Sequence, residues 1–278
     1  MKQKIILLLL VLCAGLPSVA QHRHEISIAG GYGLSSLQYE SNFSNHKKGY
    51  NAQAGLGYNF YFTPNWSVKT GAGLGFYSAN VSLDGTVSYP KNRVGDIDFA
   101  YAYTGYKETV STALLTVPVM VQGETGGRVA FYAALGAKIG IPLLAQYKTS
   151  GHLTTSGYHV IYKLLFDNLP HYGFGQYDVD EITGWDLNLS VQLSLEAGAK
   201  WRLTDRFSLY VGGYFDYGLM NLNKKPDDVV GTRLITYQPA TKPDEYKFFY
   251  GGLFNNSKKL YPVAAGITLR LSFGLSSL

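Results

Sequence analysis

The sequence predicts an all-β chain that forms an eight-stranded antiparallel transmembrane β-barrel of the up-and-down type, and three observations predict it. Apolar and polar residues alternate with period two in eight segments. The connections between these segments alternate between short turns and long loops. Only 15% of the 278 residues are charged, against roughly 25% in an ordinary soluble domain.

The N-terminus has the features of a secretory leader. Two early lysines precede the apolar run Ile5–Leu12, and the small residues Ser18–Ala20 follow it. The apolar run is too short to cross the ~30 Å hydrocarbon core as a helix. The sequence therefore predicts a signal peptide over residues 1–20 and an outer-membrane β-barrel domain over residues 21–278.

The only cysteine, Cys13, lies inside this leader. A lipoprotein would be cleaved just before that cysteine, but Leu12 stands where such a site needs a small residue. Processing before Gln21 would leave a chain without disulfides or cysteine-based zinc sites. The net charge of +5 falls by two with the leader's lysines, and this mildly basic balance gives no reason to expect nucleic acid as a partner.

The alternation is clearest from Trp185 to Arg202, where one face is apolar and the other is polar or glycine. A helix would scatter Asp186, Glu196 and Lys200 around all sides, whereas a strand puts them on one face. In chain order, the expected strands cover residues 25–34, 50–62, 66–77, 113–122, 128–141, 185–202, 207–220 and 260–273.

The connections predict which end of the barrel faces which way. The short turns cover residues 63–65, 123–127 and 203–205, and the long loops about 35–49, 78–110, 146–184 and 222–259. In outer-membrane barrels short turns are periplasmic and long loops extracellular. The alternation of residues 98–103 predicts a strand that continues beyond the membrane as a hairpin. The long loops are rich in tyrosine, a residue typical of binding loops: Tyr89, Tyr101, Tyr103, Tyr106, Tyr158, Tyr162, Tyr172, Tyr177, Tyr237, Tyr246 and Tyr250.

Aromatic residues near the short turns favour a membrane barrel over a soluble sandwich, whose strands average about five or six residues. They predict an aromatic girdle formed by Tyr58, Phe60, Phe62, Trp66, Trp201 and Phe207. A soluble, lipocalin-like barrel is the alternative, and it would need a more apolar interior. A sheet in lipid must close, because every backbone N–H and C=O needs an internal partner.

Three short motifs, in order, resemble a known family. They are Gln21 after the cleavage site, the strand Leu114–Met120 with its proline, and the closing strand Gly266–Phe273, which is similar to an outer-membrane insertion signal. Together the motifs resemble the Bacteroidetes outer membrane β-barrel domain family, the PorT-like and OmpX-like group, over residues 25–275. The resemblance implies export to the bacterial outer membrane and the barrel-assembly machinery as a partner. Five residues follow Phe273, where the insertion signal usually ends the chain.

The inward face of the predicted barrel carries charges that must find partners, because an unpaired buried charge is costly. We expect a structural network of Lys69, Lys138, Asp186, Glu196, Lys200, Arg202, Asp216 and Arg270. Glu196 is expected to bridge two or more of Lys69, Lys138, Lys200 and Arg270. The network could serve as an ion path or as a plug, and eight strands favour the plug because side chains fill so narrow an interior.

The remaining candidates concern the loops. Lys258 and Lys259, just before the last strand, could contact lipopolysaccharide or form a solvated charge run. His152, His159 and His171 share a loop without a metal-ligand spacing, so no metal or cofactor is expected. No catalytic residue is expected either, because no predicted strand carries the histidine that a lipid-A deacylase needs.

The sequence thus predicts a structural or surface-interaction role through tyrosine-rich extracellular loops. A transport or secretion accessory barrel is the first alternative, and a lipid-A-modifying or proteolytic enzyme is the second. The expected partners are outer-membrane lipid, lipopolysaccharide and an extracellular partner of unknown identity.

Overall fold

The computed structural model of the chain describes residues 23–39, 45–47, 49–83, 85–224, 234–239, 242–254, 257 and 259–275. The predicted signal peptide over 1–20 lies outside these residues. The strands are β1 (His24–Tyr39), β2 (Asn45–Lys47), β3 (Gly49–Tyr61), β4 (Trp66–Ser82), β5 (Thr86–Val94), β6 (Ile97–Glu124), β7 (Val129–His159), β8 (Leu164–Phe166), β9 (Gly175–Gly184), β10 (Ser190–Arg202), β11 (Phe207–Gly218), β12 (Ile235–Gln238), β13 (Lys247–Tyr250) and β14 (Leu260–Leu275). A single 3-10 turn, η1 (Pro170–Tyr172), joins β8 to β9. Among the described residues, no helix has the length and apolarity to cross a membrane.

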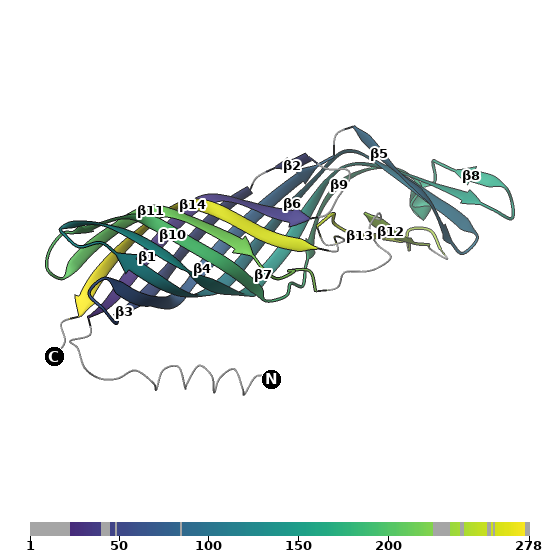
Figure 1. Cartoon of the computed structure of the whole chain (residues 1–278). Coiled ribbons are helices and arrows are strands. Elements are labelled where there is room, and N and C mark those ends of the chain that lie inside the picture. The colour runs from purple at the N-terminus through teal and green to yellow at the C-terminus, as the bar shows by residue number, and fades with distance from the viewer. Residues whose placement is uncertain are drawn as a thin grey trace, which may run out of the picture.

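Eight of these strands pair in a closed antiparallel ring (Figure 1). Following the ring, the order is β1, β3, β4, β6, β7, β10, β11 and β14, and β14 pairs back onto β1. All eight pairings are antiparallel, so the predicted all-β barrel is confirmed. His24 pairs with Leu275, which places the first and last described strand residues side by side at the short-turn end.

The outer and inner faces of the ring differ as the alternation predicts. Outward side chains are aliphatic or aromatic and exposed, with Phe131 at 71% and Leu135 at 54%. Most inward side chains are polar or small, and Lys200 and Ser194 are completely covered. This inverted arrangement suits a sheet that meets hydrocarbon on its outside.

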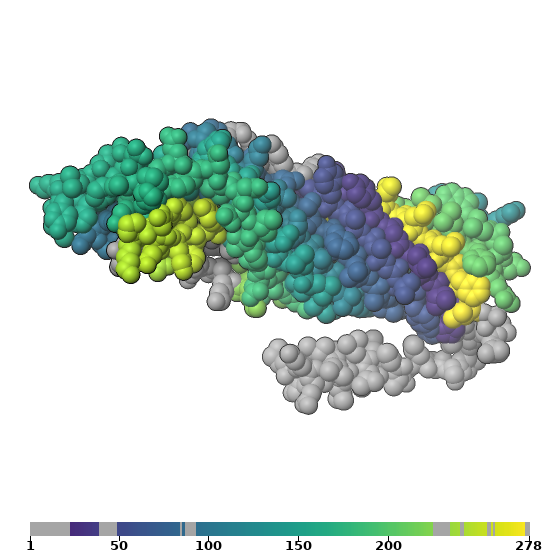
Figure 2. All heavy atoms as spheres, turned by 180° about the vertical axis from the view of Figure 1, so that it is seen from behind, coloured from purple at the N-terminus to yellow at the C-terminus, as the bar shows by residue number. Residues whose placement is uncertain are grey.

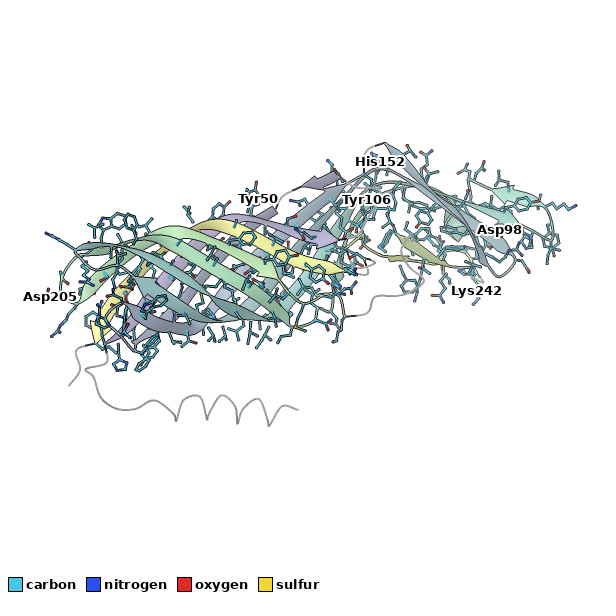
Figure 3. The ribbon with its side chains drawn as sticks, viewed as in Figure 1. Tyr50, Asp98, Tyr106, His152, Asp205 and Lys242 are labelled. Carbon is cyan, nitrogen blue, oxygen red and sulfur yellow. The ribbon has the colours of Figure 1, made fainter. Side chains whose placement is uncertain are left out.

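Strands β6 and β7 continue far beyond the ring and form the base of a second unit, here called the arm. The arm consists of β5, β8, β9, β12, β13 and the distal parts of β6 and β7, residues 97–107 and 150–159. Figure 3 shows the barrel and the arm side by side, with Asp205 at the short-turn end of the barrel and Asp98 in the arm. The predicted extension over 98–103 is confirmed, because β6 begins at Ile97 and pairs there with β5.

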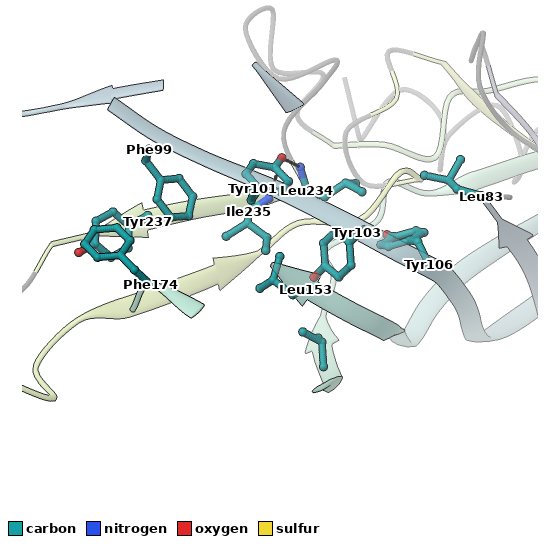
Figure 4. Close-up of a cluster of buried hydrophobic side chains, with 11 residues drawn as sticks. Leu83, Phe99, Tyr101, Tyr103, Tyr106, Leu153, Phe174, Leu234, Ile235 and Tyr237 are labelled. Atoms are coloured by element: carbon teal, nitrogen blue, oxygen red, sulfur yellow. Dashed lines mark hydrogen bonds between the residues drawn. The ribbon is translucent and has the colours of Figure 1, made fainter. Parts of the chain in front are cut away.

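The arm has its own hydrophobic core, shown in Figure 4. This arm core consists of Leu83, Phe99, Tyr101, Tyr103, Tyr106, Leu153, Phe174, Val179, Leu234, Ile235 and Tyr237. The β12–β13 hairpin supplies Ile235 and Tyr237, although it comes from the last long loop. Seen from behind, its yellow-green atoms pack beneath the teal atoms of β7 to β9 (Figure 2). Three long loops, which are far apart in sequence, therefore build one structure.

The start of the sixth ring strand differs from the expectation. Residues 185–189 are not part of β10, which begins at Ser190. Trp185 is 8% exposed and its ring meets Tyr147 edge-on at 6.3 Å, so it packs over the barrel mouth rather than facing outward. The placement of Asp186 in the lumen is wrong for the same reason, since the chain has already left the strand there. Its side chain is 89% exposed and lies 3.6 Å from Lys224.

Candidate functional site

A dense charge network fills the short-turn end of the lumen. Lys200 on β10 places its Nζ 2.8 Å from Glu124 Oε2 and 3.3 Å from Glu25 Oε1. The Tyr210 hydroxyl lies 2.9 Å from Glu124 Oε1 and 3.0 Å from Glu25 Oε2. Tyr61 donates to Glu124 at 2.5 Å. Each carboxylate is thereby hydrogen-bonded to several donors, as buried charges require.

Two ion pairs cross the middle of the lumen. Lys69 Nζ contacts both carboxylate oxygens of Glu196, at 2.7 and 2.6 Å. Lys138 Nζ contacts Asp216 Oδ2 at 2.7 Å. The first pair joins β4 to β10 and the second joins β7 to β11, so each links strands that are not neighbours in the ring. Such cross-lumen pairs hold the barrel walls at a fixed separation.

Arg270 on β14 is bound differently. It donates to Gln122 Oε1 at 2.7 Å, and its guanidinium lies 3.9 Å from the ring centre of Tyr210 and 5.3 Å from that of Tyr132. Aromatic faces attract a cation electrostatically. No carboxylate lies within ion-pair distance of Arg270 among the residues that the structure describes.

The geometry of Glu196 differs from the expected bridge. Of the four cations predicted to share it, the described contacts join it by hydrogen bond only to Lys69. Lys138 and Lys200 pair with other acids, because Glu196 faces Lys69 across the narrow lumen. Arg202 lies half-buried at the short-turn end, and its Nε is covered without a hydrogen-bond partner.

Sequence reasoning missed the two acids of the short-turn network. Glu25 begins the first strand, and Glu124 falls within a segment expected to be a turn. The sequence did carry a signal, because alternate residues of a strand point to the same side. Glu25 points inward with Ser27, and Glu124 points inward with Gln122. Strand ends are difficult to place from sequence, and this hid both residues.

The aromatic residues predicted as a girdle lie around the short-turn end. Tyr58, Phe62, Trp66, Trp201 and Phe207 are between 37% and 51% exposed. Phe60 is half-buried and packs against the His24 ring at 5.5 Å. These aromatic residues lie at a similar height along the barrel axis because of the strand register, which sets Phe60 opposite Val68 and Phe207 opposite Phe273.

An apolar cluster closes the other end of the lumen. This mouth cluster consists of Leu37, Ala79, Val81, Val110, Tyr147, Trp185, Leu222, Phe254 and Leu260. Phe254 comes from the last long loop and is 1% exposed. The lumen is therefore charged at its short-turn end and in its middle, and apolar side chains cover its mouth at the long-loop end.

Glu108 anchors this cover. It lies on β6 on the long-loop side of the apolar band, next to the exposed polar residues Lys107 and Thr109. Its carboxylate accepts hydrogen bonds from the Leu253 N–H at 2.6 Å and the Tyr106 hydroxyl at 2.7 Å. Burial without a cation raises the pKa of Glu108 to about 7, although these hydrogen bonds act in the opposite direction.

Hydrogen bonds fasten the two halves of the arm together. The Tyr101 hydroxyl accepts from the Leu234 N–H at 2.7 Å, and the Tyr237 hydroxyl donates to the Tyr172 carbonyl at 2.7 Å. The rings of Phe99 and Tyr237 stack at 4.7 Å. Burial raises the pKa of Tyr237 to about 12, so its hydroxyl remains a donor at any physiological pH. These contacts make the arm a packed unit rather than a set of separate loops.

The polar candidates of the loops lie on the surface. His152 pairs with Asp178, and His171 lies 3.0 Å from Asp244. No group of three or more possible metal ligands occurs within the described ranges. Lys259 is exposed just before β14, whereas Lys258 lies outside the described residues.

The far end of the arm carries an exposed apolar tip, at the turn from β7 to β8. It consists of Ile161, Tyr162, Leu164 and Leu165, which are 64%, 71%, 53% and 63% exposed. Lys163 lies among them with a left-handed backbone, φ 55°. Soluble surfaces rarely gather so many large apolar residues at one place without a binding role.

Comparisons with known proteins agree with this architecture. The family model described as outer membrane protein beta-barrel domain matches residues 18–222. No curated protein matches the chain.

Three solved structures are among those similar to the chain. Neisserial surface protein A is 8% identical, with 90% of this chain and 96% of that chain covered and a TM-score of 0.32. Outer membrane protein OprG from Pseudomonas aeruginosa is 14% identical, with 93% and 99% covered and a TM-score of 0.37. The attachment invasion locus protein of Yersinia pestis, solved with a heparin analogue, is 14% identical, with 89% and 98% covered and a TM-score of 0.28. At these identities and TM-scores, the similarity carries no argument about function.

Proposed function

The chain belongs to the outer membrane protein β-barrel domain family, and from this premise we propose that it acts at the bacterial cell surface through its arm. The barrel is the membrane anchor in this proposal, and the arm is the part that meets a partner. Export through a cleaved leader over residues 1–20, and membership of the Bacteroidetes PorT-like and OmpX-like group, belong to the same proposal.

The observation that carries the proposal is the packed arm. Loops that only connect strands have no need of a shared core, yet Tyr103 and Leu153 are completely covered at a site outside the ring. Binding residues lie disproportionately on loops that a rigid scaffold holds in place. A rigid unit also loses little conformational entropy when it binds, which favours affinity.

The filled lumen supports an anchor over a channel. Lys69, Lys138 and Lys200 each pair with an acid across the interior, and Phe254 covers the mouth. An aqueous path through eight strands would have to displace these pairs. The proposal therefore assigns neither transport nor a reaction to the barrel.

The apolar tip supports a partner that offers an apolar surface. In the orientation common to outer-membrane barrels, the tip lies at the extracellular end, far from the bilayer that holds the barrel. At the long-loop end of the barrel, the exposed Lys259 directly precedes β14, where lipid-A phosphates would lie, and lipopolysaccharide contact by Lys258 and Lys259 is proposed on this ground. Insertion by the barrel-assembly machinery is proposed from the closing strand, β14.

The test compares three forms displayed on the same bacterial cells. One is the full chain, one has the arm replaced by short turns above the ring, and one carries Ile161→Ser with Leu165→Ser at the tip. Binding to immobilised extracellular proteins and polysaccharides should be lost without the arm and reduced by the tip change. Phe249→Ser, which replaces a residue 55% exposed on β13, is the matched control and should leave binding intact.

Two results would contradict the proposal. The first is binding that does not depend on the arm although all forms reach the surface equally. The second is a steady single-channel current through the purified full chain in planar bilayers, which would assign the barrel to transport instead.

A further inference from the structure

A cavity of about 80 Å³ lies in the middle of the lumen, between the two cross-lumen ion pairs. Its charged lining residues are Lys69, Lys138, Glu196 and Arg270. Glycines on β3 and β4, such as Gly55 and Gly73, leave the opposite wall without side chains. A cavity needs only about 10–15 Å³ of such volume to hold one water, so this one has room for an ion and its nearest waters.

Three residues that line the cavity carry a covered polar atom with no hydrogen-bond partner. They are Ser27 with its hydroxyl, Tyr132 with its hydroxyl and Arg270 with Nη1. Arg270 is only 3% exposed, so bulk water does not serve it. All three groups can donate, and the Arg270 guanidinium can only donate. No acceptor among the described residues bonds these three groups, although the Glu196 carboxylate also lines the cavity.

The charges around the cavity are unequal. Lys69, Lys138 and Arg270 are cations, and they line the cavity together with one carboxylate, Glu196. Glu196 balances Lys69, and Asp216 behind Lys138 balances that lysine. The positive charge of Arg270 remains without a carboxylate at ion-pair distance, in a lumen where an uncompensated charge is costly.

We propose that the cavity binds one small monovalent anion of halide size, with Arg270 as its principal ligand and Lys69 and Lys138 as flanking cations. One negative charge makes the group neutral, and the anion accepts the donors that the protein leaves unused. Water alone would satisfy the donors but would not balance the charge. The anion would thus be a structural component of the barrel, independent of what the arm binds.

The direct test is crystallisation of the purified chain in detergent with bromide as the probe, followed by anomalous diffraction. The expected result is a bromide peak in the lumen within hydrogen-bonding distance of Arg270 Nη1. Ordered water in the cavity with no anomalous signal would overturn the proposal. A peak that persists unchanged after Arg270→Gln would be an adventitious ion only and would also overturn it.

Thermal unfolding in micelles gives a second measurement, with bromide exchanged for the much larger gluconate at constant ionic strength. Bromide should raise the Tm of the full chain. Arg270→Gln should raise the bromide concentration for half of this shift about tenfold or more, since a hydrogen bond to a charged group contributes about 1.5–3 kcal/mol.

Two variants separate the anion from general damage to the lumen. Glu196→Gln removes the only carboxylate of the lining and should lower the half-saturating bromide concentration. Arg202→Gln removes a lumen cation that does not line the cavity and should leave the bromide dependence unchanged. If Arg270→Gln does not fold, these two variants and the bromide peak still test the proposal. An empty cavity, together with a bromide dependence that Glu196→Gln leaves unchanged, would contradict it.

Discussion

The barrel and the arm are built on the same two strands, yet their faces have opposite character. In the ring, β7 turns Phe131, Leu135 and Ile139 outward and keeps Lys138 inside. In the arm, the same strand turns His152 and Thr154 outward and keeps Leu153 inside. The sheet is continuous, so the change reflects what surrounds each part. Hydrocarbon surrounds the ring, and water surrounds the arm.

Irregularities in the pairing of β6 and β7 accompany this change. The register shifts between Ala113 and Leu114 and again between Thr104 and Lys107. Gly105 lies in the second shift and has a left-handed backbone with φ 64°, a conformation that glycine adopts most easily. On β6 the covered residues are even-numbered in the ring, such as Glu108, and odd-numbered in the arm, such as Tyr103. The extra residue keeps one continuous inner face, which is charged in the lumen and aromatic in the arm.

The largest effect is expected from breaking a lumen ion pair. Lys200→Met leaves Glu124 covered without its cation and leaves Glu25 with only the partly exposed Arg23, which costs about 3–5 kcal/mol in the free energy of unfolding. Urea unfolding in lipid vesicles measures this. The matched control is Arg93→Met, which breaks the exposed pair with Asp98 on the arm and should cost less than about 1 kcal/mol. Equal costs would contradict the distinction between the two regions.

A nearly equal but local loss is expected in the arm core. Tyr103→Ala empties a completely covered site and should destabilise the arm by about 3–5 kcal/mol, while the ring stays folded. Amide hydrogen exchange should rise throughout the arm, including residues 97–107 and 150–159, and stay unchanged in the ring. Tyr162→Ala at the exposed tip is the control and should not change exchange. A simultaneous loss of the ring would show that the arm is not a separate unit.

The pattern of alternation predicted the ring well, and the reason is physical. Lipid outside and charge inside impose period two on every strand, so strands such as the one around Leu193 are visible without a structure. The arm core was only partly visible. Residues 98–103 alternate, but the contacts of Tyr101 with Leu234 join loops more than 130 positions apart, and no local pattern encodes that pairing.

The network of the lumen was predictable only in part of its membership, and not in its pairing. The alternation along a strand shows which charged residues face inward, and on this basis Lys69, Lys138 and Glu196 were assigned to the lumen. Which cation meets which acid depends on strand stagger around the closed ring. For that reason the bridge on Glu196 was wrong, and the role of Glu25 was missed.

A third experiment places the same charge on the outer face of β7 in each region. Leu135→Arg puts a cation into hydrocarbon and should cost about 2–4 kcal/mol in vesicles. Thr154→Arg lies on the exposed face of the arm and should change stability by less than about 0.5 kcal/mol. Urea titrations of both variants in the same lipid make the comparison. Similar costs for the two variants would remove the membrane from the explanation.

The smallest effect concerns Glu108, where the loop of Leu253 closes over the mouth. The closed loop holds this carboxyl with a pKa of about 7, against 4.5 when it is free. Closure therefore weakens as the pH rises from about 4.5 to 7, by about 1–3 kcal/mol. Hydrogen exchange of the Leu253 and Phe254 amides, corrected for intrinsic rates, should report more opening at pH 8 than at pH 5. Glu108→Gln should abolish this difference, and a difference that survives would assign it to another group.

The central claim is that the outer face of β7 passes from lipid to water between Ile139 and Lys148. Cys13 is the only cysteine of the chain, so single nitroxide labels can be introduced once it is removed with the leader or replaced. Labels at Phe131, Leu135, Ile139, Lys148 and His152 in lipid vesicles should be more accessible to oxygen than to a nickel chelate at the first three positions. The preference should reverse at the last two. Accessibility to the nickel chelate that is equally high at all five positions would contradict the account.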